Sequence, residues 1–494
     1  MKMLVRDKKF YRDFFTMTMT IALQNLIVYG VNLADNIMLG AYSETALSGV
    51  AIANQVQFLL QMVVTGTASG MGVIISQYWG KRQTEPIKRV FAVGFWISLL
   101  LSAIMSAIVW FVPYGVMGLL TNEQSIIPAG VEYLKIMVFS YLMFSISNSL
   151  LGVMRSVETV RIGFYISLST LLINICLNYT LIYGHFGAPE LGVKGAAYAT
   201  LTSRAVEFIA SIIYCRFIDK KLKLRIKDVF ALERSYIADF MKSGVPLLLS
   251  NVSWGVAMSV QAAILGRLGA SGIAASSIAQ TLFQCTSVIA YATGDAARVM
   301  TGMAVGEGDM KKVKSGAKTM QLMFLIIGVL TSFVLFLVRK PIISVYNASV
   351  ETAELANIFV LILCVTAIGT AYEMPCLTGI VSGGGDTNFV FFNDIVFMWC
   401  IVLPLSALSA FYFKFPPAVT FALLKADQIL KCFVAAAMTR QMMRILFAVR
   451  FFICQQSTTS EPKGMNASFA NLKYWSPSGM PIIVQQQTTP IAAQ

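Results

Sequence analysis

Asp35 lies within the sequence VYGVNLADNIMLG (residues 28–40) and is the only charged residue between Asp13 and Glu44. The apolar run around it is long enough to cross a bilayer as a helix. A charged side chain at the bilayer centre costs about 2.5–3.5 kcal/mol on insertion scales, so residues of this kind often mark ion or substrate pathways. Asp35 is therefore the first candidate for chemistry in this chain, with interhelical hydrogen bonding as the alternative role.

Asparagine side chains surround Asp35 in the sequence and recur in a second apolar run. One stripe of the first helix would carry Asn25, Asn32, Asp35 and Asn36. In the second run, Asn174 and Asn178 are i,i+4 neighbours on one helix face. If the two helices face each other, their carboxylate and carboxamide oxygens would form a cluster suited to a monovalent cation that sheds its water. A proton that neutralises Asp35 is the alternative coupling ion.

Other ionisable residues also fall inside apolar runs. Glu373 could face a cavity and attract cationic compounds, or it could pair with a lysine or a backbone group. Asp295 precedes Arg298 by three positions, which favours a local ion pair. Lys425 and Asp427 are expected to pair near the last helix. These residues are weaker candidates for function than Asp35.

The composition is that of an integral membrane protein. Apolar residues make up 57% of the 494 residues and charged residues only 13%, which excludes an ordinary soluble protein with a polar exterior. Twelve apolar windows are each near or above the roughly 20 residues that a helix needs to span a bilayer: 14–39, 46–78, 91–112, 131–153, 162–184, 193–215, 244–266, 273–303, 319–338, 353–378, 389–412 and 417–438. Because lipid cannot satisfy backbone polar groups, we expect an all-α protein with twelve transmembrane helices.

The basic residues predict the orientation of the spans. They gather in alternate loops: before the first span, at 81–89, at Arg155 and Arg161, at 216–242, at 311–318 and after Arg440. The positive-inside rule then predicts a multi-pass protein of the cell membrane with both termini in the cytoplasm. No cleavable signal peptide is expected, because the basic N-terminal residues lead straight into a full-length span.

The spans form two related sets of six, separated by the basic segment at 216–242. A shift of 226 residues superposes the first two spans of each set and aligns Leu23 with Leu249, Asn25 with Asn251, Thr67 with Thr293, and Gly80 with Gly306. This constant offset favours internal duplication. At the position of Asp35 the second set has Gln261, so we expect a cation site in the first lobe only. Parallel six-span repeats are typical of transporters that hold substrate between two lobes.

These observations predict the domain organisation in five parts: a cytoplasmic segment at 1–13, an N-lobe at 14–218, a cytoplasmic linker at 219–243, a C-lobe at 244–440 and a largely disordered cytoplasmic tail at 441–494. The tail is rich in Gln, Thr, Ser and Pro. Pseudo-symmetric lobes would enclose a central cavity.

Several function classes have little support. The eight cysteines lack metal-binding spacings, and His185 is the only histidine, so neither a disulfide framework nor histidine-based catalysis is expected. The GGGD sequence at 383–386 lacks the Lys-Ser/Thr of a phosphate-binding loop and is interpreted as a tight turn. We therefore expect no enzymatic activity, no cofactor and no nucleic-acid partner.

The chain resembles the multidrug and toxic compound extrusion (MATE) transporters over about residues 14–440. The resemblance is carried by ADNIMLG at 34–40, GVIISQYWGK at 72–81, RSVETVR at 155–161, GDT at 385–387 and, most specifically, NICLNYTLIYGHFGAPELGVKGAAYAT at 174–200. It implies a twelve-helix efflux protein with a V-shaped cavity that exports organic, often cationic, compounds in exchange for Na⁺ or H⁺. A monomer in contact with membrane lipid is the default that the family implies.

The predicted sites follow from the polar pattern and the resemblance together. The predicted cation-coupling residues, which would also ligate Na⁺ if the protein is sodium-coupled, are Asp35, Asn174, Asn178, Asn32 and Thr200. The predicted substrate-cavity residues are Glu373, Gln261, Gln280 and Asn54.

Two positions depart from the family pattern. Trp254 stands where some members have an acid in the seventh helix, which argues against a cation site of that kind in the second lobe. Thr20 stands where a proline is common in the first helix, although Pro246 occurs in the second half of this chain. Bending of the first helix that depends on proline is therefore in doubt.

Other transport functions stay open at this point. A flippase for a lipid-linked precursor would need a basic cavity, whereas most Lys and Arg residues lie in the predicted cytoplasmic loops. Export of a specific endogenous metabolite would use the same architecture. An uncoupled channel would leave Asp35 and its asparagines unexplained, and a membrane enzyme would need paired catalytic acids or a histidine cluster.

Overall fold

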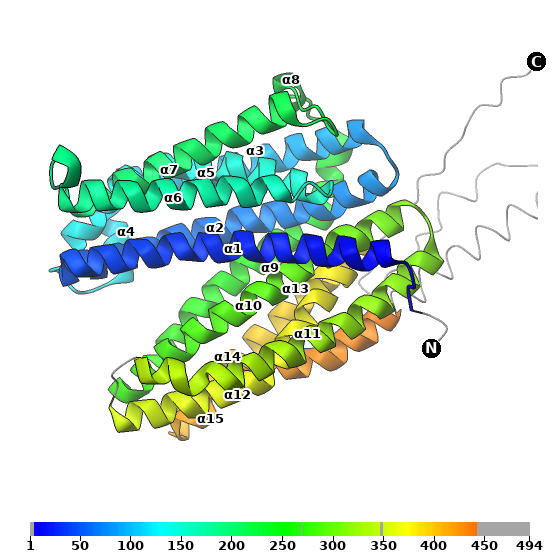
Figure 1. The fold of residues 1–494 in the computed structure, drawn as a ribbon. Coiled ribbons are helices and arrows are strands. Elements are labelled where there is room, and N and C mark those ends of the chain that lie inside the picture. Colours follow the sequence, from blue (N-terminus) through cyan, green and yellow to red (C-terminus); the bar gives the residue numbers. More distant parts are fainter. Residues whose placement is uncertain (1–3, 268, 346–348, 442–494) are drawn as a thin grey trace, which may run out of the picture.

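The computed structural model describes residues 4–267, 269–345 and 349–441, and these contain helices and no β-strand. They form two helical bundles, an N-lobe and a C-lobe (Figure 1). The described part therefore confirms the predicted all-α architecture of two lobes. Most of the predicted tail, residues 442–494, lies outside the described residues.

The N-lobe follows the chain order of the first half. Its helices are α1 (Lys8–Tyr42), α2 (Glu44–Gly80), α3 (Thr84–Phe111), α4 (Pro113–Leu120), α5 (Ile127–Ser156), α6 (Arg161–Tyr183), η1 (His185–Gly187), α7 (Val193–Ile213) and η2 (Tyr214–Ile218). Short polar caps separate the long helices. Ser43, for example, lies between α1 and α2 and caps the N-terminus of α2, where its Oγ accepts a hydrogen bond from the N–H of Ala46.

The C-lobe repeats this order after the short linker helix α8 (Ile226–Val229). Its helices are α9 (Arg234–Leu265), α10 (Gly269–Gly306), α11 (Met310–Val345), α12 (Val350–Met374), η3 (Pro375–Val381), α13 (Thr387–Ile395), η4 (Val396–Val402), α14 (Leu403–Ala407), η5 (Leu408–Tyr412) and α15 (Pro417–Leu424), followed by helix at 427–441. The GGGD sequence forms the predicted turn between η3 and α13, with Gly385 at φ 104° and Asp386 capping α13.

Ten helical segments of the described chain are long and apolar enough to cross a membrane. The other two predicted spans, 193–215 and 417–438, correspond to α7 and to a helical segment at 417–441 that is broken at Lys425–Ala426. Both carry buried charged residues, including Glu207 in α7 and Lys431 in the last segment. Together with the ten, they complete the twelve-helix arrangement.

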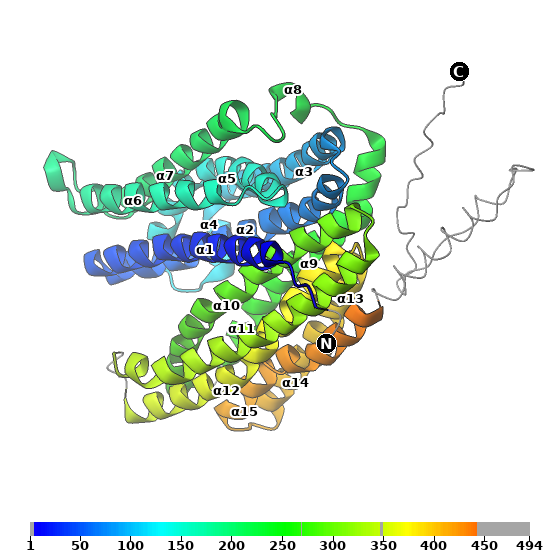
Figure 2. The ribbon, with the colours of Figure 1, turned by 45° about the vertical axis from the view of Figure 1, so that its right-hand side comes forward.

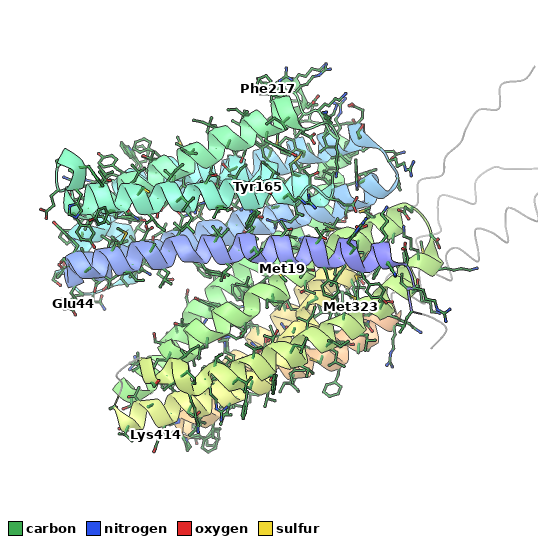
Figure 3. The ribbon with its side chains drawn as sticks, viewed as in Figure 1. Met19, Glu44, Tyr165, Phe217, Met323 and Lys414 are labelled. Carbon is green, nitrogen blue, oxygen red and sulfur yellow. The ribbon has the colours of Figure 1, made fainter. Side chains whose placement is uncertain are left out.

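The lobes meet at one end and diverge at the other (Figures 1 and 2). The N-terminal end of α1 and the linker helix α8 lie at the end where the lobes meet. In Figure 3, Glu44 at the α1–α2 junction and Lys414 before α15 lie at the end where they diverge. The loops that are rich in basic residues therefore share one end of the molecule.

Helix α1 belongs to both lobes. Its first half packs Phe14, Met17 and Ile21 into a core with residues of α10 and α11, including Phe324, whose ring centroid is 6.3 Å from that of Phe14. Its second half packs Leu39 into an N-lobe core with residues of α2 and α5. A movement of α1 is thus coupled to both halves of the protein.

The contact between the lobes is reciprocal and depends on glycine. A Cβ added to Gly80 in α2 would lie 2.1 Å from the carbonyl oxygen of Met303 in α10, and one added to Gly306 in α10 would lie 2.0 Å from that of Gln77 in α2. Gly80 and Gly306 are 226 positions apart, as are Gln77 and Met303. The two repeats therefore meet through the same surface of each, which a shared origin of the halves explains.

Candidate functional site

Four of the predicted residues form one buried hydrogen-bonded cluster inside the N-lobe. Asn178 Nδ2 donates to Asp35 Oδ1 and, at 3.1 Å, to Asn174 Oδ1. Thr200 Oγ1 donates to Asp35 Oδ2 at 3.3 Å, and Asn174 Nδ2 donates to Thr200 Oγ1 at 3.3 Å. Asp35 is only 4% exposed and both asparagines are 0% exposed. The cluster thus joins α1, α6 and α7 away from water.

Local structure holds these three helices in place near the cluster. Tyr183 of α6 donates its hydroxyl to the carbonyl oxygen of Met38 on α1 at 2.7 Å. Helix α6 ends at Gly184, whose φ of 71° lets the chain turn back toward α7. At the start of α7, Gly195 lets the helix approach closely, because a Cβ there would be 2.4 Å from the carbonyl oxygen of Leu181. These contacts fix the register of Thr200 against Asn174 and Asn178.

The residues of the cluster could hold a cation. Among the described residues, Asp35 forms no ion pair with a lysine or arginine, and the nearby Arg204 pairs instead with Glu207 at 2.7 Å. Asn178 Oδ1 is buried without a hydrogen-bond partner. A buried polar atom without a partner is costly, and a buried charge usually requires compensation. Asp35, Asn174, Asn178 and Thr200 together offer oxygen ligands of the type that hard cations prefer.

A small cavity lies beside the cluster, between α1, α6 and α7. Its volume of about 20 Å³ exceeds the minimum of about 10–15 Å³ that one water molecule needs. Polar side chains line much of it: Ser167, Thr170, Asn174, Thr200, Ser203, Arg204 and Glu207. The Arg204–Glu207 pair was not predicted, although two opposite charges three positions apart in the apolar run 193–215 were a signal that could have identified it.

Asn32 is the one predicted coupling residue that the structure leaves apart. Its side chain is exposed and makes no hydrogen bond with the cluster, and Asn36 is exposed as well. The buried face of α1 is narrower than the predicted stripe: it includes Asp35 and Leu39, whereas Asn32 and Asn36 point away from it.

The C-lobe encloses a second group of charges. Lys431 Nζ lies 2.9 Å from Asp394 Oδ1 and 3.7 Å from Asp427 Oδ2, and Ser250 of α9 donates to Asp394. Glu373 on α12 is buried and interacts electrostatically with Lys431. The structure thus favours a lysine partner for Glu373 over exposure to a cavity. Asp394 and Lys431 were not predicted.

Lys425 and Asp427, which were predicted to pair, interact electrostatically but form no ion pair in the described structure. The Nζ of Lys425 lies 4.4 Å from the centroid of the Phe283 ring. Asp427 pairs with Lys431 instead, because the helix breaks at 425–426 and the i,i+4 spacing then favours Lys431. By contrast, the predicted Asp295–Arg298 pair is confirmed at 3.2 Å.

The four predicted cavity residues do not form one cluster. Gln261 is buried in the C-lobe, where its Nε2 lies 3.4 Å from Met398 Sδ, and Glu373 is also buried there. Gln280 on α10 and Asn54 on α2 are half-buried. Near Gln261, an apolar pocket of about 470 Å³ between α9 and α14 is lined by residues that include Val260, Ile264, Trp399 and Leu403.

An aromatic cluster connects the lobes. The ring of Phe58 on α2 lies 6.3 Å, between centroids, from that of Trp254 on α9, which lies 6.3 Å from that of Tyr291 on α10. All three side chains are half-buried. Trp254, the departure from the family pattern in the seventh helix, is therefore at the contact between the lobes.

Known proteins share this architecture. The MatE family model matches residues 20–180 and 246–408, which is more than half of the chain. The uncharacterized transporter YisQ of Bacillus subtilis is 22% identical over 411 residues, covering 83% of this chain and 89% of YisQ.

Solved structures resemble the fold at low sequence identity. A crystal structure of MATE in complex with MaL6 has a TM-score of 0.80 at 18% identity and covers 88% of this chain and 97% of its own. A MOP-superfamily transporter of Pyrococcus furiosus, described as having a binding pocket of reverse polarity, gives 0.80 at 18% identity, with coverage of 88% and 96%. A mutant of the Vibrio cholerae MATE transporter VcmN gives 0.77 at 15% identity, with coverage of 88% and 97%. From the family match over both lobes, this chain belongs to the MATE family of membrane transporters.

Proposed function

We propose that this protein is a secondary efflux antiporter, which exports organic, often cationic, compounds in exchange for Na⁺ or H⁺ entering the cell. The observation that carries the proposal is the buried Asp35 carboxylate, which has amide and hydroxyl partners and, among the described residues, forms no ion pair, although Arg204 acts on it electrostatically. A permanent structural role would favour a lysine or arginine partner, as Asp394 has in the C-lobe. An exchangeable cation or proton would balance the negative charge of the buried Asp35 carboxylate.

The bound ion would be held by the residues of the cluster. Na⁺ would use oxygen ligands, and rotation of the Asn178 amide would bring its unpartnered Oδ1 into use. H⁺ would neutralise Asp35 directly and leave the amides as hydrogen-bond partners. Within the described residues, no three His, Cys, Asp or Glu side chains are arranged so that they could hold a metal ion. The amide and hydroxyl oxygens around Asp35 favour a monovalent ion over a transition metal.

Helix α1 would couple ion binding to the movement of the lobes. The half of α1 that carries Asp35 packs in the N-lobe, and the half that carries Phe14 and Ile21 packs in the C-lobe. An ion at Asp35 changes the contacts of α1 with α6 and α7, and the repacked helix would then lower the affinity for substrate. Substrate leaves outward and the lobes rock to the other state. The uninterrupted α1 transmits this change without a proline at Thr20.

The membrane potential can drive this exchange. Each elementary charge that moves inward across 100 mV contributes about 2.3 kcal/mol, enough for about 50-fold accumulation when one cation exchanges for one neutral substrate molecule. Export of a monovalent organic cation needs two inward cations for the same net movement of charge, and its one-for-one exchange is driven by the ion gradient alone. The basic loops at the end where the lobes meet support a cytoplasmic location of that end and of both termini. On this orientation the lobes diverge toward the outside, which suits a state that releases substrate. We propose a monomer in the cell membrane, and no cofactor besides the coupling ion is needed.

Aromatic side chains support the choice of substrate class. The Phe58–Trp254–Tyr291 cluster lies between the lobes and offers ring faces to a cation, an interaction of about 0.5–2 kcal/mol. The second candidate is a flippase for an anionic lipid-linked precursor, and its support is Lys425, a buried base that forms no ion pair within the described residues, although Asp427 acts on it electrostatically. A transport assay should therefore include both organic cations and an anionic lipid probe.

The test is transport in proteoliposomes with imposed Na⁺ and H⁺ gradients, varied separately. We expect Asp35→Asn to abolish gradient-driven export of an organic cation such as ethidium. Asp13→Asn is the matched control, because it makes the same chemical change on α1 at a partly exposed residue beside Arg12. Undiminished coupled export by Asp35→Asn would remove the site assignment, and export driven by neither gradient would remove the antiport proposal.

A further inference from the structure

One carboxylate divides its two oxygens between the lobes. Asp295 on α10 of the C-lobe accepts a bond through Oδ2 from Arg155 Nη1, at the end of α5 in the N-lobe, at a distance of 2.9 Å. Its Oδ1 lies 3.2 Å from Nη2 of Arg298, three residues further along α10. Arg298 is held in turn by the carbonyl oxygen of Thr378, which accepts from its Nε at 3.0 Å. One arm of this triad therefore crosses between the lobes and the other stays in the C-lobe.

The triad of Arg155, Asp295 and Arg298 lies at the end where the lobes meet, near the contacts of Gly80 and Gly306. The three side chains are 26%, 20% and 12% exposed for Arg155, Asp295 and Arg298, so water screens them only in part. A second polar bond crosses nearby, where Gln77 Nε2 donates to the carbonyl oxygen of Gly383 at 3.2 Å. The hydrogen bonds and the close packing of α2 against α10 therefore both hold the N-lobe against the C-lobe at this end.

We propose that Arg155 and Asp295 form a latch that holds the lobes together at this end and opens once in each transport cycle. This inference rests on the proposed transport by alternating access, which requires the lobes to separate where they now meet. When Arg155 withdraws, Asp295 keeps Arg298, so the carboxylate is never left without a basic partner. Such an arrangement makes the bond strong enough to close the lobes and still reversible, since a buried charge that loses its last partner is severely penalised.

The latch is present in only one of the two repeats. A shift of 226 residues places Ser69 at the position of Asp295 and Gly72 at that of Arg298. The glycine contacts, in contrast, occur in both repeats. The repeated surface therefore provides close packing, and the single ion triad adds an electrostatic bond that can be removed by mutation without altering that packing.

The test measures the separation of the lobes directly. Spin labels are attached to Arg161→Cys in the N-lobe and Lys311→Cys in the C-lobe, two exposed positions near this end, in full-length protein in nanodiscs with native cysteines replaced by serine. Pulsed electron paramagnetic resonance then gives the ratio of separated to joined lobes. We expect Arg155→Gln to raise this ratio about tenfold, the effect of losing one hydrogen bond to a charged group. Arg155→Lys, which keeps the charge, should restore most of the wild-type ratio.

Arg298→Gln is the matched control, because it removes the other arm of the same triad and keeps the Arg155–Asp295 bond between the lobes. Glutamine also keeps a carbon atom at the Cδ position, which in Arg298 lies 4.0 Å from a Cβ added to Gly72 of α2. We expect it to lower thermal stability and to leave the ratio within twofold of wild type. An unchanged ratio in Arg155→Gln, or an equal rise in both glutamine variants, would overturn the latch. A wild-type protein with a single distance under every Na⁺ and pH condition, and equally in Arg155→Gln, would instead refute alternating access itself.

Discussion

The side-chain amide of Asn178 on α6 donates hydrogen bonds to Asp35 on α1 and to Asn174, one turn earlier on α6, so a single side chain connects α1 with α6. If the protein is sodium-coupled, we expect Asn178→Ala to weaken Na⁺ binding about tenfold or more, because the amide oxygen is lost as a ligand. If the coupling ion is H⁺, the same variant should instead strengthen proton binding about tenfold or more, because the lost hydrogen bond stabilises the charged carboxylate by about 1.5–3 kcal/mol. The measurement is the Na⁺ or H⁺ concentration that gives half-maximal export.

The matched control is Asn36→Ala, an exposed asparagine on α1 outside the cluster, which should leave that concentration unchanged. Equal ion dependence of wild type and Asn178→Ala would count against this residue as a ligand or as an anchor of Asp35.

The Arg204–Glu207 pair in α7 should stabilise the N-lobe. Both side chains are largely buried, so Arg204→Met or Glu207→Leu alone leaves one charge without its partner and should destabilise the fold by about 3–5 kcal/mol. The double variant Arg204→Met/Glu207→Leu should recover most of the loss. Thermal unfolding in detergent ranks the variants by stability. A stability loss in the double variant equal to the sum of the two single losses would contradict the prediction.

The glycine contacts between the lobes predict a steric effect. Gly80→Ala places a methyl group 2.1 Å from the carbonyl oxygen of Met303, and we expect α2 and α10 to move apart at a cost of about 1–3 kcal/mol. Gly118→Ala on α4 is the control, because nothing lies within 4 Å of its added Cβ. The measurements are the unfolding temperature and the spin-label distance between the lobes. If both quantities were equal in the two alanine variants, the contact between α2 and α10 would not be tightly packed.

The two buried lysines of the C-lobe should differ in effect. Lys431→Met leaves Asp394 and Asp427 without their common base and should destabilise the protein by about 3–5 kcal/mol. Lys425→Met removes an interaction with the Phe283 ring, which contributes about 0.5–2 kcal/mol. The two variants are compared by their folded yield in size-exclusion chromatography and by their unfolding temperature. A larger loss of stability in Lys425→Met would show that the ion pairs of Lys431 contribute less than the contact of Lys425 with Phe283.

The sequence alone determined the membrane class, the helical architecture and the repeat. Long apolar runs such as that of residues 14–39 are expected to be helices in lipid, because the backbone must satisfy its own polar groups and the run is too long and too uniformly apolar for a barrel strand. The offset of 226 residues between Gly80 and Gly306 showed the duplication, and the isolated charge of Asp35 among apolar residues identified the candidate site. These features depend on local composition and spacing, which a sequence displays directly.

Only the tertiary structure decided which polar residues meet. Asp35 and Asn32 are equally plausible by helical spacing, but packing against α6 buries the first and exposes the second. Arg155 and Asp295 are 140 residues apart, so their contact depends on how the two lobes dock. Lys425 and Asp427 are close in sequence yet do not pair, because a helix break directs Asp427 toward Lys431. Partner choice is set by the relative rotation and docking of helices, which spacing within one segment does not encode.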